Sequence, residues 1–131
     1  MAGVLGCGID LLETARIDKY FSLNQFNFPC KEQVFTEYEL SHLNQEGASS
    51  YFPLAFSCKE SAFKAFGISW TNSPAQWTDV ELNISNANKF DVHLSGYLKD
   101  LSLEIGVQNI ETAFHYPSEG LLFFKLILFS K

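Results

Sequence analysis

The sequence has little positive charge and almost no arginine. Its 131 residues include nine Lys or Arg against fifteen Asp or Glu, which gives a formal net charge of −6, and Arg16 is the single arginine. Because nucleic-acid binding needs a clustered basic face, this balance argues against a nucleic-acid partner. The chain also has no run of about 20 apolar residues, the length that crosses a bilayer, so no membrane partner is expected.

Cysteine is scarce and carries no recognisable pattern. The three cysteines, Cys7, Cys30 and Cys58, show no C-x-x-C spacing, so neither a disulfide framework nor a zinc site is indicated. The N-terminal segment "MAGVLGCGIDLL" lacks the basic start of an export signal. Together these features predict a cytoplasmic protein.

Hydrophobic residues, by contrast, are abundant and make up 47% of the chain, with thirteen Phe. This content and length are typical of one folded domain, here residues 1–131. Short apolar stretches and helical patterns alternate along the chain, and their order favours an α+β fold. The segment "LLFFKLILF" is apolar enough to be the central strand of a sheet.

Several element boundaries are predicted from local signals. A strand in "GVLGCGIDLL" should end near Asp10, and a helix should follow in "ETARIDKYFSLN". Thr36 and Glu39 match a capping box at the start of a second helix. A third helix should begin at Ser49 or Ser50 and end at Gly67. The remaining predictions are strands at "TDVELNI", "FDVHLSG", "NIETAFHY" and "LLFFKLILF", with one more helix at "GYLKDLSLEIG".

The third helix carries charged residues beside its phenylalanines, in "FSCKESAFKAFG" (56–67). At about 100° per residue, Lys59 falls inside the apolar arc. Glu60 and Lys64 lie four residues apart at its border, in the Glu-before-Lys order that favours pairing. One interpretation is an exposed ion pair, with Lys59 extending its ammonium out of the core; the other is a group of catalytic residues. The spacing alone leaves both open.

Three motifs, in this order along the chain, favour the catalytic interpretation over the exposed ion pair: "GIDLLETARI", "VFTEYEL" and "FSCKESAFKAFG". The chain resembles the holo-acyl-carrier-protein synthase type of 4′-phosphopantetheinyl transferase along nearly its whole length. The fixed positions of the family pattern are all filled, by Asp10, Glu13, Arg16, Ile17, Phe35, Thr36, Glu39, Lys59, Glu60, Lys64, Ala65 and Gly67. The resemblance implies a small antiparallel sheet packed with helices. It also implies Mg²⁺-dependent transfer of the phosphopantetheine arm of coenzyme A to a serine of an apo acyl carrier protein, releasing 3′,5′-ADP.

The resemblance assigns roles to five residues. Asp10 and Glu60 are implied to hold Mg²⁺, which prefers oxygen ligands, and Lys64 completes the catalytic set by contacting the leaving phosphate. Lys59 is implied to face phosphates or a neighbouring subunit, and His115 to contact the phosphates of coenzyme A. Alternatives stay open for two of them: Asp10 as a cap for the next helix, and His115 as an ordinary polar residue on a strand.

Partner binding is also implied by the resemblance. Arg16 and Lys19 share one helical face, which would dock the carrier protein; the alternative is a solvated charged face. Relatives of this length form homotrimers with active sites between subunits. Ala55 and Phe114 depart from the family pattern, which leaves a second function open, that of a catalytically impaired relative that only binds carrier protein or coenzyme A. Whether the carrier serves fatty-acid or polyketide synthesis is not indicated.

Overall fold

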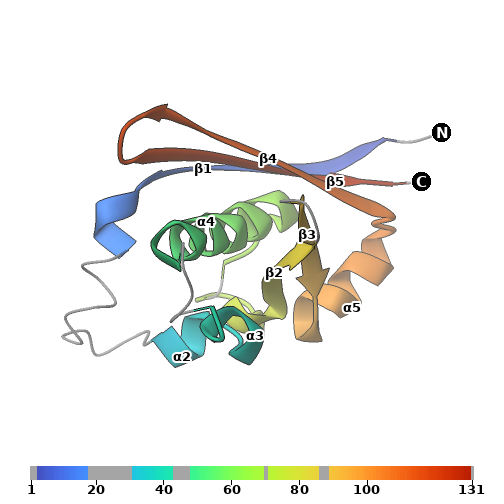
Figure 1. Ribbon diagram of the computed structural model, residues 1–131. Coiled ribbons are helices and arrows are strands. Elements are labelled where there is room, and N and C mark those ends of the chain that lie inside the picture. Colours follow the sequence, from blue (N-terminus) through green and yellow to red (C-terminus); the bar gives the residue numbers. More distant parts are fainter. Residues whose placement is uncertain (1–2, 18–30, 43–47, 70, 86–88, 131) are drawn as a thin grey trace.

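The computed structural model describes residues 3–17, 31–42, 48–69, 71–85 and 89–130. It confirms the α+β fold, a small antiparallel sheet packed with helices. The elements are β1 (Val4–Glu13), α2 (Lys31–Val34), α3 (Glu37–Leu40), α4 (Ala48–Phe66), η1 (Trp77–Asp79), β2 (Val80–Ser85), β3 (Lys89–Leu94), α5 (Gly96–Ile105), β4 (Asn109–Ser118) and β5 (Leu121–Phe129). The labelled helices and the β2–β3 hairpin all lie on one side of the sheet that β1, β4 and β5 form (Figure 1).

The three-stranded sheet has the order β1-β5-β4 and is antiparallel throughout. The apolar last strand is therefore central, as its composition predicted. Alternate residues of β5 are buried, and Leu122, Phe124, Leu126 and Leu128 form the face that packs on α4. Residues 121, 123, 125, 127 and 129 form the opposite face, which we call the outer face of the sheet.

Two glycines of β1 allow α4 to approach the sheet closely. A Cβ atom at Gly6 would lie 2.1 Å from the carbonyl oxygen of Ala65, and one at Gly8 would lie 1.8 Å from that of Ser61. Both distances are shorter than any real contact, so a side chain at either position would push the helix away. Because alternate residues of a strand share a face, Asp10 follows Gly6 and Gly8 on the side that meets α4.

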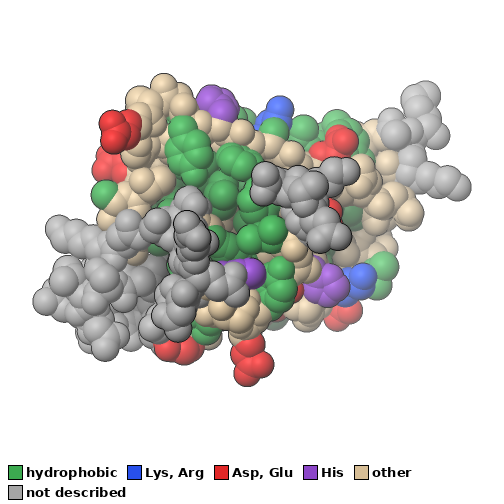
Figure 2. All heavy atoms as spheres, viewed as in Figure 1, with side chains coloured by type: hydrophobic (Ala, Val, Ile, Leu, Met, Phe, Trp, Pro, Cys, Tyr) green, Lys and Arg blue, Asp and Glu red, His purple; other side chains and the backbone are tan. Residues whose placement is uncertain are grey.

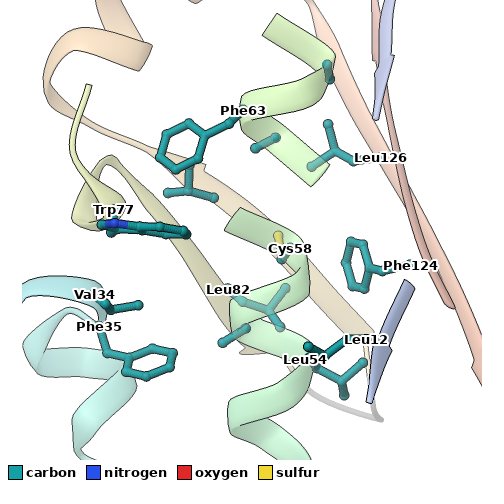
Figure 3. Close-up of a cluster of buried hydrophobic side chains, with 14 of the residues drawn as sticks. Leu12, Val34, Phe35, Leu54, Cys58, Phe63, Trp77, Leu82, Phe124 and Leu126 are labelled. Carbon is teal, nitrogen blue, oxygen red and sulfur yellow. The ribbon is translucent and has the colours of Figure 1, made fainter. Parts of the chain in front are cut away.

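The hydrophobic core lies on both sides of α4. In Figure 3, Leu54, Cys58 and Phe63 of this helix lie between two groups of side chains. Phe124 and Leu126 come from the three-stranded sheet, and Leu82, Trp77 and Phe35 come from the opposite side. The helix is thus enclosed by apolar contacts, which contribute roughly 1.5–3 kcal/mol for each large side chain that is fully buried.

Several predicted boundaries are confirmed. Thr36 accepts a hydrogen bond from the Glu39 amide and Glu39 accepts one from the Thr36 amide, so the capping box of α3 is present. Gly67 follows α4 with φ of 72°, the left-handed conformation that ends helices and that glycine adopts at low cost.

Other boundaries are wrong. The helix α4 begins at Ala48, so Ser49 and Ser50 lie inside its first turn and do not cap it. The first strand continues past Asp10 to Glu13, because residues 11–13 pair with 121–123 of β5. Thr78 belongs to η1 and not to the strand that follows. The predicted helix after Glu13 is helical at residues 14–17, and the rest of it lies outside the described residues.

Candidate active site

Asp10 and three residues of α4 form a polar cluster where β1 meets the helix. One carboxylate oxygen of Asp10, Oδ2, accepts a hydrogen bond of 2.7 Å from Ser57. The other, Oδ1, lies 3.3 Å from the ammonium of Lys64, which also donates to the carbonyl oxygen of Ile9 at 2.9 Å. The Asp10 side chain is only 12% exposed, whereas that of Lys64 is 50% exposed. The cluster therefore has a fixed acidic interior and a cationic rim.

Glu60 is the second carboxyl group of this cluster. Its pKa is raised mainly because burial disfavours the charged form, and further because Asp10 is close enough to repel it; Lys64 acts in the opposite direction. The Lys64 ammonium forms its ion pair with Asp10 across the interface of β1 and α4. The pair predicted within the helix, Glu60 with Lys64, is thus replaced by one that ties the helix to the strand.

The Asp10 and Glu60 pair fits a hard divalent cation. Two neighbouring carboxyl groups that repel each other are stabilised when a cation binds between them. Among the described residues there is no group of three or more His, Cys, Asp and Glu side chains suited to a metal ion. Two carboxylates are nonetheless a common protein contribution to a Mg²⁺ site, because water and substrate phosphates supply the other ligands.

Lys59 has a structural role, and the expectation that it faces phosphates or a neighbouring subunit is wrong. Its side chain is completely buried, and its ammonium lies 2.7 Å from Oε1 of Glu39. The ammonium also donates to the carbonyl oxygens of Trp77, at 3.1 Å, and of Val80. Since these partners come from α3, η1 and β2, Lys59 anchors the side of α4 that faces away from β1. It neither extends to solvent nor reaches the acidic cluster.

His115 lies on the other side of the sheet from Asp10. In the register, Asp10 and Phe114 are both opposite Phe124, whereas His115 is opposite Phe123. Directly opposed residues share a face, so His115 projects from the outer face, where its ring lies 5.0 Å from that of Phe123. The structure therefore does not bring His115 and Asp10 into one site within a single chain.

The two residues predicted to bind the carrier protein differ in what the structure describes. Arg16 is exposed in the helical residues 14–17, and its neighbour Ile17 is buried in the core. The side of this turn that carries Arg16 therefore faces solvent. Lys19 lies outside the described residues.

Sequence reasoning missed Ser57. It stands in the third motif beside the charged residues, but a hydroxyl in a helix carries no signal of its own. Only the packing of β1 on α4 reveals that it faces Asp10.

Comparisons with known proteins identify the family. The family model of the 4′-phosphopantetheinyl transferase superfamily matches residues 6–117. A curated holo-[acyl-carrier-protein] synthase of Geotalea daltonii is 28% identical over 108 residues, covering 82% of this chain and 84% of that protein.

Two solved structures share the fold. The holo-ACP synthase of Plasmodium yoelii superposes with a TM-score of 0.80 at 21% identity and covers 100% of this chain and 98% of its own. A Bacillus anthracis holo-(acyl-carrier-protein) synthase, solved in complex with CoA (3′,5′-ADP), has a TM-score of 0.70 at 21% identity and covers 98% of each chain.

The family match over most of the chain, together with the shared fold, defines the class. The chain belongs to the 4′-phosphopantetheinyl transferase superfamily. The enzyme type that the three motifs predicted, a holo-acyl-carrier-protein synthase, is confirmed by the family match together with the curated relatives.

Proposed function

We propose that this protein transfers the 4′-phosphopantetheine arm of coenzyme A to a serine of an apo acyl carrier protein and releases 3′,5′-ADP. The observation that carries the proposal is the convergence of Asp10, Glu60 and Lys64 where β1 meets α4. Phosphoryl-type transfer depends on electrostatic stabilisation of phosphate oxygens, and this cluster offers both a candidate cation site and the half-exposed ammonium of Lys64. The relative solved with CoA supports coenzyme A as the donor.

We propose Mg²⁺ as the resident cation, held by Asp10 and Glu60. When bound, it would neutralise negative charge on the pyrophosphate of coenzyme A. The donor set supports this choice, because carboxylates and phosphates are the ligands that Mg²⁺ prefers.

Lys64, Glu60 and Asp10 would then have different roles in the reaction. Lys64 is half exposed, so its ammonium can turn from Asp10 to the phosphate that leaves with 3′,5′-ADP. Glu60, the second carboxylate of the cluster, is the proposed acceptor of the carrier serine proton. Asp10 keeps its hydrogen bond from Ser57 when Lys64 turns away.

A homotrimer with active sites between subunits is supported by the outer face of the sheet. Val4, Ile9 and Leu11 are 63%, 48% and 61% exposed there, an unusual amount of apolar surface for a monomer. No described helix covers this face (Figure 1). His115 projects from the same face, so a second subunit packed against it would bring His115 toward a neighbour's coenzyme A.

The carrier protein is the proposed partner of Arg16, and of Lys19 if the helix continues as predicted. An exposed guanidinium suits paired hydrogen bonds to the carboxylates of an acidic carrier. On the face shown in Figure 2, the described Lys and Arg side chains lie at separate points and form no continuous basic patch. Recognition would then depend on a few local cations.

None of the described helices is long and apolar enough to cross a membrane. We place the reaction in the cytoplasm.

The alternative of an impaired relative is not favoured. Phe114 replaces a hydroxyl residue of the family pattern, but its ring stacks on Phe124 and meets Phe90 edge to face, so it has a packing role. A protein that only docks carrier or coenzyme A has no use for the partly buried carboxylate pair of Asp10 and Glu60.

Incubation with apo carrier proteins, coenzyme A and Mg²⁺, followed by intact mass of the carrier, tests the proposal. We expect one phosphopantetheine group per carrier. An unmodified mass for each of several fatty-acid and polyketide carriers, with 3′,5′-ADP undetected, would overturn it.

A further inference from the structure

Ser57 makes the shortest polar contact to Asp10. Its hydroxyl donates to Oδ2 over 2.7 Å, and the serine side chain is completely buried. A hydrogen bond to a charged acceptor is stronger than one between neutral groups, and burial removes competition from water. Asp10 therefore has one oxygen held firmly by the helix that also carries Glu60.

The second oxygen of Asp10 is held less firmly. Its partner Lys64 lies at 3.3 Å and has a half-exposed side chain, and exposed ion pairs contribute little. If Lys64 turns to a phosphate during the reaction, the hydrogen bond from Ser57 is the contact among the described residues that still holds the Asp10 side chain in its rotamer.

We propose that Ser57 is a positioning residue for Asp10, orienting its carboxylate so that the free lone pairs face the cation site shared with Glu60. This inference rests on the proposed function. The contact is a feature of this chain, and groups that orient a metal-binding carboxylate commonly change metal affinity by about 10–100-fold when removed.

The same helix offers a matched control one turn away. Ser61 is also completely buried, but its hydroxyl points to the carbonyl oxygen of Phe124 at 3.5 Å and not to a carboxylate. Ser57→Ala and Ser61→Ala therefore remove the same atom from the same buried helix, and only the first removes a contact to Asp10. Ser57→Cys adds a test of volume, because a thiol fills the space but donates weakly.

Two measurements compare these variants. In the metal-free protein, three-bond NMR couplings of the Asp10 β-protons report its χ1 rotamers. We expect one rotamer in the wild type and in Ser61→Ala, and an average in Ser57→Ala and Ser57→Cys. In the transfer assay, we expect Ser57→Ala to raise the half-saturating Mg²⁺ concentration by about tenfold while the rate at saturating Mg²⁺ changes little.

The outcomes separate this inference from the proposed function. Unchanged couplings and an unchanged Mg²⁺ requirement in Ser57→Ala, or equal effects of Ser57→Ala and Ser61→Ala, would overturn the role of Ser57. Absence of transfer by the wild type would overturn the proposed function, and the NMR comparison alone would then decide whether Ser57 fixes Asp10.

Discussion

The ammonium of Lys59 lies 2.7 Å from Oε1 of Glu39, and neither side chain is exposed to solvent. The second Glu39 oxygen accepts the Leu82 amide at 3.0 Å, so the carboxylate has partners on both sides. This pair divides the motif residues into two groups. Glu39 and Lys59 join α4 to α3, whereas Lys64 joins α4 to Asp10 of β1. In Figure 1, α3 lies below α4 and β1 lies above it.

Breaking the buried pair should destabilise the fold strongly. Lys59→Met leaves Glu39 buried without its counterion, which costs about 3–5 kcal/mol. Urea denaturation measures this loss. Lys64→Met, at the half-exposed site, should cost under about 1 kcal/mol. Because both charges are then gone, Lys59→Met with Glu39→Leu should recover much of the loss; a double variant as unstable as Lys59→Met would contradict the pairing.

Gly8→Ala should separate β1 from α4. The new Cβ would lie 1.8 Å from the Ser61 carbonyl oxygen, a backbone atom that cannot move alone. We expect a loss of about 3 kcal/mol, as for a severely overpacked core, and loss of transfer because Asp10 moves away from Glu60. Gly3→Ala is the control, since its Cβ would meet only Ser130 Oγ at 3.5 Å. Equal stability of the two variants in urea would show that the close approach is not needed.

Glu60→Gln should lose activity and gain stability at neutral pH. The pKa of Glu60 is raised in the folded state. The neutral form of Glu60 therefore increases the free energy of unfolding. This contribution is complete below the ordinary pKa of glutamate and is lost as the pH rises through the raised pKa of the folded state. Glutamine mimics the neutral form, so the variant should exceed the wild type near pH 7 and approach it near pH 4.

Urea denaturation at the two pH values, with Glu104→Gln on the exposed side of α5 as control, checks this prediction. A variant that is less stable than the wild type at pH 7 would assign Glu60 to the fold and not to the active site.

His115→Ala should weaken coenzyme A binding more than it lowers the maximal rate, the pattern of lost uniform binding. His115 lies on the outer face, away from Asp10. In the proposed trimer it would contact the coenzyme A of a neighbouring subunit and not the groups that react. Steady-state kinetics with varied coenzyme A measures the effect, and His93→Ala, at an exposed residue of β3, is the matched control. A KM for coenzyme A equal to that of the wild type would leave His115 without a role in binding.

Arg16→Glu should raise the KM for the carrier protein steeply and leave coenzyme A binding unchanged. It should also weaken the salt dependence of association, because exposed charges act mainly on the rate of encounter. Lys99→Glu, at an exposed residue of α5, makes the same change in net charge elsewhere. Kinetics at two salt concentrations distinguish them; a carrier KM raised equally by both variants would indicate net repulsion and no docking site at Arg16.

Local sequence signals predicted what depends on local structure. The capping box at Thr36 and the helix end at Gly67 follow from backbone chemistry within a few residues. The central position of β5 follows from its composition. The helical projection placed Lys59 in the apolar arc correctly, but it could not supply Glu39, which stands 20 residues earlier and reaches Lys59 only through tertiary packing.

The same limit explains the other differences. Whether Asp10 and His115 share a face depends on the strand register, which is fixed by the pairing of β1 and β4 with β5. The contact of Ser57 with Asp10 depends on how closely α4 approaches Gly6 and Gly8. Neither relationship is contained in spacing along one segment.

The role of Asp10 in transfer is measured by the intact mass of an apo carrier protein after incubation with coenzyme A, Mg²⁺ and either wild type or Asp10→Asn. The asparagine keeps the side-chain volume and can still accept from Ser57 through its amide oxygen, but it removes the charge. We expect complete modification by the wild type with equimolar 3′,5′-ADP, and almost none by Asp10→Asn in the same folded state. Modification at a near wild-type rate by Asp10→Asn would contradict an active site built on Asp10 and Glu60.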